Sequence, residues 1–451
     1  MPPPSPAPSS SKPKYFYGWT MLGIATVATM STSPGQTFLV SQFYTSFKTE
    51  LGLESSAPLA TIYGIGTLCA GLLMPRIGSL SDRFGTRVMM GLSAAALAFA
   101  CALIGYANSL FTLCIAFFCL RAFGQGALGL VAAHTLAMWY EKRLGIAESI
   151  RHTGMSIANV VLPPLAIAMI ALLGWKTAYG IFGLLVYIVV IPPVLFLFRN
   201  KPEDIGQHVD NRPPEPHEHP AIEDLEPDAV AEVSLDAHAG SPRSPINEKY
   251  FTPAQACRTQ AYWIVSAALV ANATFFTAIA LMHQVIVAEA GHSEAVAASL
   301  LPLSGLVAML AVPISGILVD RFAERKLLAC TTVLLGLACS CVAFAEILPV
   351  LYASMVLMGM TQSLIFVLAS PIFARYFGRK HHGAIRGTLT RSMIIGTAVG
   401  PAVLAFAADA FGSYQIPLLL CGATAIPLTI AALSMRQPPY PDNPSRPIAS
   451  E

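Results

Sequence analysis

Twelve stretches of the chain are long and apolar enough to cross a lipid bilayer as helices. A transmembrane helix needs about 20 predominantly apolar residues, because it rises about 1.5 Å per residue through a hydrocarbon core about 30 Å thick. Gly and Pro recur inside these stretches, and membrane helices tolerate both. The sequence therefore predicts an all-α integral membrane protein, with transmembrane helices near 17–45, 58–77, 88–107, 110–138, 145–173, 176–198, 260–288, 296–319, 327–346, 349–374, 385–409 and 414–435.

The composition agrees with a chain whose main solvent is lipid. Hydrophobic residues make up 55% of the chain and charged residues 12%, whereas soluble proteins carry about 25% charged residues. This argues against a soluble enzyme, a nucleic-acid-binding protein and a disulfide-rich secreted scaffold. The sequence shows no nucleophile–base pair, metal-ligand spacing or nucleotide-binding loop. We therefore expect no enzymatic activity, no cofactor and no bound metal.

Polar segments divide the chain into parts. We expect a disordered N-terminus at 1–16, a six-helix half at 17–200, an acidic linker at 201–258, a second six-helix half at 259–436 and a tail at 437–451. The linker holds 12 of the 25 acidic residues together with several prolines, a composition typical of disordered segments.

The basic residues of the loops predict the orientation. Loops on one side of the expected membrane are rich in Lys and Arg, whereas the loops on the other side hold only Lys48 and Lys176. Basic loops stay on the cytoplasmic side, so both termini are expected in the cytoplasm. The short loops and the lack of sorting signals favour a bacterial inner (plasma) membrane.

The two halves repeat each other at a constant offset of 238 residues. Chance identities would not hold one register over about 100 residues, and parallel duplicated halves are typical of secondary transporters. The matching pairs include Pro75/Pro313, Gly78/Gly316, Asp82/Asp320, Gly145/Gly383, Pro163/Pro401 and Gly174/Gly412.

The repeat is most pronounced between the second and third helices, where residues 78–87 read GSLSDRFGTR. This segment resembles the loop signature G-x-L-x-D-R-x-G-x-R of the major facilitator superfamily. The second copy, GILVDRFAER at 316–325, differs by Ala323 in place of the second Gly. The resemblance implies the twelve-helix major facilitator fold.

We interpret the two loops as a conformational latch, in which Asp82 pairs with an Arg or favours a neighbouring helix N-terminus. Gly85 suits a tight turn because it has no Cβ. The alternative is that the basic residues only fix orientation. The latch residues are Gly78, Asp82, Arg83, Gly85, Arg87, Gly316, Asp320, Arg321 and Arg325.

Two further segments favour one branch of the superfamily. The tripeptide YGW at 17–19 and the segment WYEKRLGIA at 139–147 resemble monocarboxylate porters and oxalate/formate transporters. The eighth helix has no charge between 297 and 319, so the Asp/Arg pair typical of animal monocarboxylate porters is absent. The resemblance implies transport of a small organic anion, foremost a monocarboxylate.

Arginines within the membrane helices are the main candidates for binding this anion. An ionisable residue inside a membrane helix is a functional hypothesis by default. We expect no Asp or Glu near the middle of the membrane, so that buried arginines lack an internal counter-ion and a substrate carboxylate is the natural partner for the planar guanidinium of Arg391 or Arg121. A structural role is the alternative for both, and is favoured for Arg151. Gln36, Asn159, Asn272 and Gln362 either line the cavity or join helices.

Three histidines are candidates for proton coupling, because imidazole titrates near neutral pH. They are His283, His152 and His134. Each is alternatively a hydrogen-bonded packing residue, and the anion can also carry the proton itself.

Together these features predict a transporter that moves a small organic anion by alternating access, with proton symport. An oxalate/formate-type exchanger, a drug exporter and a transporter-like receptor remain as alternatives. The expected partners are the anion, a proton and the lipid bilayer, without nucleic acid, and a monomer is compatible with the sequence.

Overall fold

The computed structural model describes residues 15–53, 57–212 and 250–439, and this part of the chain is helical, with no strand. Ten of its helices are long and apolar enough to cross a membrane. The other two crossings are the broken segment that begins with α1 and the helix α4. The prediction of an all-α, twelve-helix membrane protein is confirmed.

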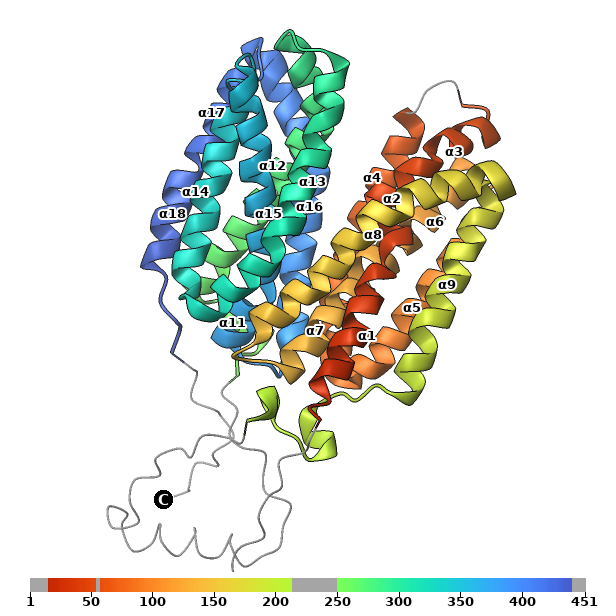
Figure 1. Ribbon diagram of the computed structural model, residues 1–451, viewed down its shortest axis with the longest axis vertical. Coiled ribbons are helices and arrows are strands. Elements are labelled where there is room, and N and C mark those ends of the chain that lie inside the picture. Colours follow the sequence, from red (N-terminus) through yellow and green to blue (C-terminus); the bar gives the residue numbers. More distant parts are fainter. Residues whose placement is uncertain (1–14, 54–56, 213–249, 440–451) are drawn as a thin grey trace, which may run out of the picture.

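The helices form two bundles (Figure 1). The first bundle packs around a core that includes Phe117, Trp139 and Tyr179. Its elements are α1 (Gly18–Met30), η1 (Ser33–Gly35), α2 (Thr37–Val40), η2 (Ser41–Phe43), α3 (Tyr44–Glu50), α4 (Ala57–Phe84), α5 (Thr86–Gly105), α6 (Leu110–Cys119), η3 (Leu120–Leu128), α7 (Gly129–Trp139), α8 (Leu144–Leu173) and α9 (Trp175–Phe196).

The second bundle has apolar clusters of its own, one around Phe373 and Phe377 and one around Leu300 and Leu335. Its long elements are α12 (Gln260–Glu289), α13 (Glu294–Arg321), α14 (Glu324–Val342), α15 (Leu348–Phe377), α16 (His382–Phe411), α17 (Gln415–Ala423) and α18 (Ala425–Ser434).

The bundles meet at one end and diverge at the other (Figure 1). The end at which they meet, called here the linker end, carries residues 209–211, which pack against α7, and Tyr250, whose ring centroid lies 5.5 Å from that of His381 just before α16. Helix α4 crosses α16 there, and α8 crosses α13. Each helix pair joins one helix from each bundle.

The linker is more ordered at its margins than the sequence predicts. Residues 202–211 form the short helices η4 (Pro202–Ile205) and η5 (Val209–Asn211), and α11 (Pro253–Ala256) follows on the other side. Asp210 accepts hydrogen bonds from the backbone N–H groups of Glu141 and Lys142. Residues 1–14 and 213–249, for which disorder is predicted, and residues 440–451 of the tail lie outside the described residues.

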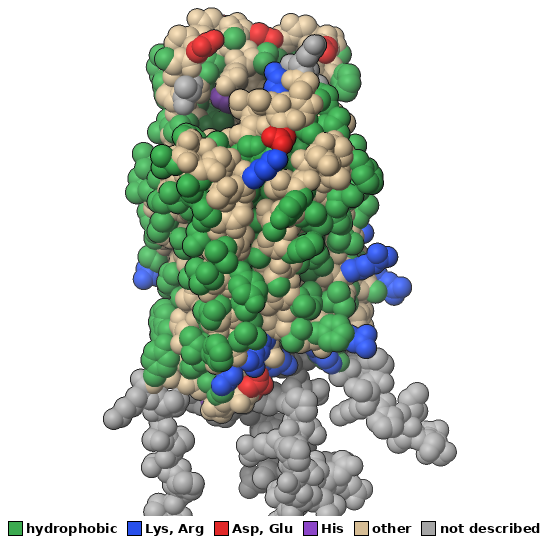
Figure 2. All heavy atoms as spheres, turned by 90° about the vertical axis from the view of Figure 1, so that its right-hand side faces the viewer, with side chains coloured by type: hydrophobic (Ala, Val, Ile, Leu, Met, Phe, Trp, Pro, Cys, Tyr) green, Lys and Arg blue, Asp and Glu red, His purple; other side chains and the backbone are tan. Residues whose placement is uncertain are grey.

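The surface fits a membrane environment. Figure 2 shows hydrophobic side chains over the middle of the visible face, with Lys and Arg gathered at its lower edge. Large apolar side chains point outward in both bundles, for example Phe111, Leu172 and Phe406. Lipid can solvate such side chains, whereas water cannot do so without cost.

Backbone conformation explains where the repeat keeps its glycines. Gly85 has φ +82°, Gly174 has φ +78° and its repeat partner Gly412 has φ +71°. Ala323 takes the place of Gly85 in the second copy, and its φ is −63°. Only Gly adopts positive φ without strain, so the second copy departs from the motif where the backbone no longer needs Gly.

Two irregular segments lie side by side in the first bundle. The first crossing breaks after Met30 into short helical pieces, and the fourth contains the nine-residue π-helix η3. Gly35 lies against η3, and a Cβ there would collide with the carbonyl oxygen of Leu120. Short π-helical segments often mark functional sites.

Candidate functional site

The bundles are joined at the linker end by Asp82. This residue on the last turn of α4 accepts hydrogen bonds from the backbone N–H groups of Gly383 (2.9 Å) and Ala384 (2.8 Å) at the start of α16. The first N–H groups of a helix lack internal partners and carry partial positive charge. Of the two partners expected for Asp82, the structure shows the neighbouring helix N-terminus.

Asp320 makes the equivalent contact in the other direction. It accepts hydrogen bonds from the N–H groups of Gly145 and Ile146 at the start of α8, both 2.8 Å long. It also accepts one from the guanidinium of Arg375, 3.0 Å away in its own bundle. The duplication has therefore produced two caps, each from one bundle to the other.

Two glycines allow the helices to approach at these caps. A Cβ at Gly78 would collide with the carbonyl oxygen of Gly383, and a Cβ at Gly316 would lie 2.6 Å from Oγ of Ser149. Both positions therefore need a residue without a side chain when the linker end is closed.

The basic residues of the two loops do not cross between the bundles. Arg87 donates to the carbonyl oxygens of Val194 (3.1 Å) and Leu195 at the end of α9, within its own bundle. Arg83 lies over the ring of Phe84, 5.3 Å from its centroid. In the described part of the chain, the exposed Arg321 and Arg325 form no hydrogen bond or ion pair.

Arg121 lies buried at the irregular segments, on η3, with 5% of its surface exposed. Its guanidinium donates to the carbonyl oxygen of Gly35 (3.1 Å) and to the hydroxyls of Thr67 (3.1 Å) and Thr37 (3.4 Å). It also lies over the ring of Tyr63, 5.1 Å from the centroid. All these partners are neutral, so they leave the positive charge uncompensated within the described residues.

A buried carboxylate corrects the expectation that the buried arginines lack an internal counter-ion. Glu148 on the second turn of α8 has 0% of its surface exposed. Its Oε2 accepts a hydrogen bond from Nε of Arg151 (2.7 Å) and forms an ion pair with Nη2 of the same residue, 2.6 Å away. Nη1 of Arg386 on α16 lies 3.8 Å from Oε1 of the same carboxylate. Arg151 therefore has the structural partner that the sequence did not reveal.

Neither Glu148 nor Arg386 is among the site residues expected from the sequence. Glu148 lies five residues after the basic segment 142–143 and resembles a loop charge. A signal was nevertheless present, because Glu148 and Arg386 are separated by the same 238 residues as the matched pairs of the repeat.

Arg391 is not brought together with the other candidates. It lies five residues beyond Arg386 on α16, about 140° around the helix. It is exposed and forms no hydrogen bond or ion pair within the described residues. Ile395 and Val399, which follow on the same side, are exposed and apolar. This position suits a side chain that extends along lipid toward the membrane surface, and Arg386 takes the inward-facing position expected for Arg391.

The polar candidates are scattered. Asn272 and Gln362 are buried in the second bundle, and Nδ2 of Asn272 and Oε1 of Gln362 lack hydrogen-bond partners. Gln36 donates to the hydroxyl of Thr32 at the break in the first crossing. Asn159 is exposed on α8.

The three histidines lie in three different environments. His134 is buried beside the first cap, with Nδ1 2.9 Å from Oγ of Ser81 and Nε2 3.5 Å from Asp82. His152 belongs to the Glu148 cluster, since its Nε2 lies 2.8 Å from Nη2 of Arg151. Among the described residues, the one hydrogen-bond partner of His283 is the carbonyl oxygen of Ala280 in its own helix, 2.8 Å from Nδ1.

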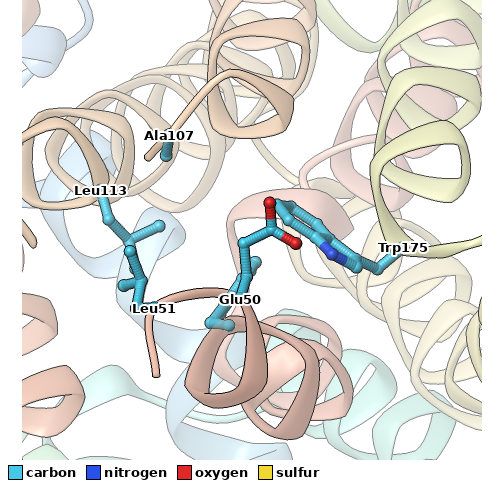
Figure 3. A pocket seen from close by; sticks show the side chains of 6 residues that line it. Glu50, Leu51, Ala107, Leu113 and Trp175 are labelled. Carbon is cyan, nitrogen blue, oxygen red and sulfur yellow. The ribbon is translucent and has the colours of Figure 1, made fainter. Parts of the chain in front are cut away.

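A small hollow at the opposite end of the first bundle is lined by Glu50, Leu51, Leu113 and Trp175 (Figure 3). The carboxylate of Glu50 already has a partner, because it accepts a hydrogen bond of 2.6 Å from Lys176. This bond lowers the pKa of Glu50 below its usual value. The hollow lies away from the caps and the buried arginines, and it has no other charged side chain in its lining.

Comparisons with known proteins agree with this architecture. The family model described as Major Facilitator Superfamily matches residues 15–284 and 264–450. A curated relative, the "Uncharacterized MFS-type transporter YcxA" of Bacillus subtilis (strain 168), is 23% identical over 136 residues. That match covers 30% of this chain and 33% of the relative, so it spans about a third of the relative's length.

Among solved structures, the crystal structure of the human organic anion transporter MFSD10 (TETRAN) is similar, with a TM-score of 0.61 and 16% sequence identity. The similarity covers 92% of this chain and 98% of that chain. At this identity it shows a common fold.

Proposed function

We propose, from the premise that this chain belongs to the major facilitator superfamily, that it carries small organic anions, foremost monocarboxylates, together with protons. The family and the fold make the protein a multi-pass membrane transporter. The anion, the coupling to protons and the direction of transport are the proposed parts.

One observation carries the anion assignment, namely the buried charge of Arg121. A buried guanidinium without an acidic partner is costly, and a carboxylate bound by two parallel N–H groups would relieve that cost. Nη2 of Arg121 takes part in none of its three hydrogen bonds, so it remains available to a ligand. The neutral partners hold the guanidinium in place without competing for its charge.

Two residues of the second bundle are proposed as further contacts of the anion. Asn272 and Gln362 each have a buried polar atom without a partner, and such atoms usually find one. A bound anion with an additional polar group would supply it. A site shared between the bundles is what alternating access requires, because their relative movement then exposes it to each side in turn.

The latch is the proposed control of this movement. The caps made by Asp82 and Asp320 close the linker end while the opposite ends stand apart (Figure 1). Opening the linker end breaks both caps at once. With the termini and the linker in the cytoplasm of a bacterial inner membrane, as the basic loops indicate, this conformation faces outward.

Uptake into proteoliposomes tests the proposal. Vesicles with and without an inward proton gradient are given labelled pyruvate, lactate, formate and oxalate. We expect gradient-driven, protonophore-sensitive uptake of a monocarboxylate. Uptake that depends on an anion loaded inside the vesicles, and not on the proton gradient, would favour the exchanger. Absence of uptake of all four anions into sealed, protein-containing vesicles would reject the carboxylate assignment.

A further inference from the structure

We propose that Glu148, Arg151 and Arg386 form a combined proton and anion site, in which the carboxylate of Glu148 holds the place of a substrate carboxylate. The inference rests on the proposed function, since it assumes an anion that is transported. It adds a second site, on helices α8 and α16, to the one at Arg121.

The cluster contains more positive than negative charge. The guanidinium groups of Arg151 and Arg386 face the one carboxylate of Glu148. His152 also borders the cluster, and its Nε2 lies 2.8 Å from Nη2 of Arg151. Because a guanidinium only donates hydrogen bonds, this nitrogen accepts and the imidazole is neutral. The cluster therefore keeps one unbalanced positive charge.

The pair between the bundles is incomplete. Oε1 of Glu148 and Nη1 of Arg386 are both buried, and neither has a hydrogen-bond partner. They lie 3.8 Å apart, which is too far for a hydrogen bond. Arg386 thus presents a buried donor to the space beside Glu148, whereas the donors Nε and Nη2 of Arg151 are used.

The position of the cluster connects it to the conformation. Glu148 and Arg386 are related by the 238-residue offset of the repeat, so they occupy equivalent positions on α8 and α16, one in each bundle. The neighbouring Ser149 lies against Gly316 at the crossing of α8 and α13. The approach of Glu148 to Arg386 therefore exists only while the linker end is closed.

The charge balance of the cluster couples proton binding to anion binding. A proton on Oε1 of Glu148 converts the carboxylate to a neutral acid and weakens its hold on both arginines. A monocarboxylate then takes its place between the guanidinium groups. One proton and one monocarboxylate together leave the charge of the cluster unchanged, whereas either alone alters it by one unit. Binding of the proton therefore favours binding of the anion, and binding of the anion favours that of the proton.

The groups around Glu148 favour this residue over His152 as the proton acceptor. Arg151 and His152 face it from α8, and Arg386 faces it from α16. The hydroxyl of Thr29 on α1 accepts a hydrogen bond from Nη1 of Arg151. A proton on Nε2 of His152 would point at a guanidinium, whereas Oε1 of Glu148 has no hydrogen bond to lose.

The first test measures the pH dependence of lactate transport by the full-length protein in proteoliposomes. For the wild type, the KM for lactate should fall as the pH is lowered from 8 to 6, by at most about tenfold per pH unit because one proton is involved. Glu148→Gln should show a KM that is independent of pH, and His152→Asn should keep the wild-type dependence. A Glu148→Gln variant with the wild-type pH dependence would overturn the proposal.

A second test needs no substrate, so it separates failure of this inference from failure of the proposed function. The nine cysteines are replaced by Ser, and Ser149→Cys is introduced as a reporter that is buried while the linker end is closed. Relative to an exposed cysteine labelled at the same pH, which corrects for the loss of reactive thiolate at low pH, maleimide labelling should increase as the pH is lowered from 8 to 6, and Glu148→Gln should remove this increase. Equal pH responses with and without Glu148 would exclude the site even if no anion were known.

A variant that lacks the charges of both Glu148 and Arg386 tests whether a change seen in Glu148→Gln results from misfolding. Glu148→Gln alone leaves two buried guanidinium groups without a carboxylate, whereas Glu148→Gln with Arg386→Gln leaves only Arg151. The double variant should also show pH-independent labelling of the reporter. Arg436→Gln, which removes an exposed charge at the linker end, serves as the control and should behave like the wild type.

Discussion

At the scale of single residues, the partners of the buried charges decide their roles. Arg121 is held by neutral oxygens and a tyrosine ring, whereas Arg151 is neutralised by Glu148 at 2.6 Å. A guanidinium that already has its carboxylate can take a ligand only after that carboxylate is protonated, whereas one without a carboxylate is available to a ligand directly. This distinction makes Arg121 the residue to test.

Arg121→Lys should impair anion transport more than Arg391→Lys. Lysine keeps the charge but cannot present the planar fork, and hydrogen bonds to charged groups contribute about 1.5–3 kcal/mol each, so we expect a loss of about tenfold or more in kcat/KM. Arg391 is exposed beside apolar residues and makes no bond that Lys would break within the described residues. The measurement is lactate uptake at equal amounts of reconstituted protein. A larger loss for Arg391→Lys would restore Arg391 as the anchor.

At the scale of helices and their turns, a glycine of the repeated motif is kept where the backbone conformation requires glycine and replaced where it does not. The turn between α4 and α5 keeps Gly85 at φ +82° and ψ +157°, a region almost exclusive to glycine. The equivalent turn before α14 runs through Ala323 in an ordinary extended conformation. The same loop motif thus ends in two different turns.

Gly85→Ala should destabilise the protein by about 1–3 kcal/mol, the cost of holding a side chain in this backbone region. A Cβ at this position would also press on the side chain of Asn200, at about 3.0 Å. Ala323→Gly is the matched control and should cost less than about 1 kcal/mol. Thermal unfolding in detergent measures both. Equal stability of the two variants would contradict the role assigned to the turn.

At the scale of the whole molecule, two symmetric caps hold the bundles together at one end. Each consists of a carboxylate, two N–H groups at a helix start and a glycine at the crossing. Asp320 has an additional partner in Arg375, which remains in place when the cap opens because it belongs to the same bundle. The hydrogen bonds that must break on opening include those of the two caps and those that Arg375 and Arg379 donate to the carbonyl oxygens of Glu141 and Met138 in the first bundle.

Asp82→Asn should open the linker end. The amide keeps one acceptor but turns a donor toward the second N–H group, and the loss of charge-assisted hydrogen bonds worth about 1.5–3 kcal/mol shifts the equilibrium by about tenfold or more. Spin labels at Val88 and Phe322, both exposed and in different bundles, report the separation. We expect a new population at longer distance. Arg83→Gln should have a smaller effect, and an unchanged distance distribution in Asp82→Asn would argue against the latch.

The membrane-spanning helices and their duplication could be predicted from the sequence alone. Hydropathy adds up along the chain, and the length of an apolar stretch is set by the thickness of the bilayer, so no knowledge of packing is needed. The repeat at 238 residues is likewise written in the order of residues. It also identified Asp82 and Asp320 as the residues that meet the other bundle.

Only the tertiary structure decided what these side chains face. The rotation of a helix about its axis determines whether Arg386 or Arg391 points between the bundles, and packing against other helices sets that rotation. The same packing gives Glu148 its burial and turns Asp82 toward backbone N–H groups instead of an arginine. Such contacts join residues more than 200 positions apart, and their geometry arises only when the two halves fold against each other.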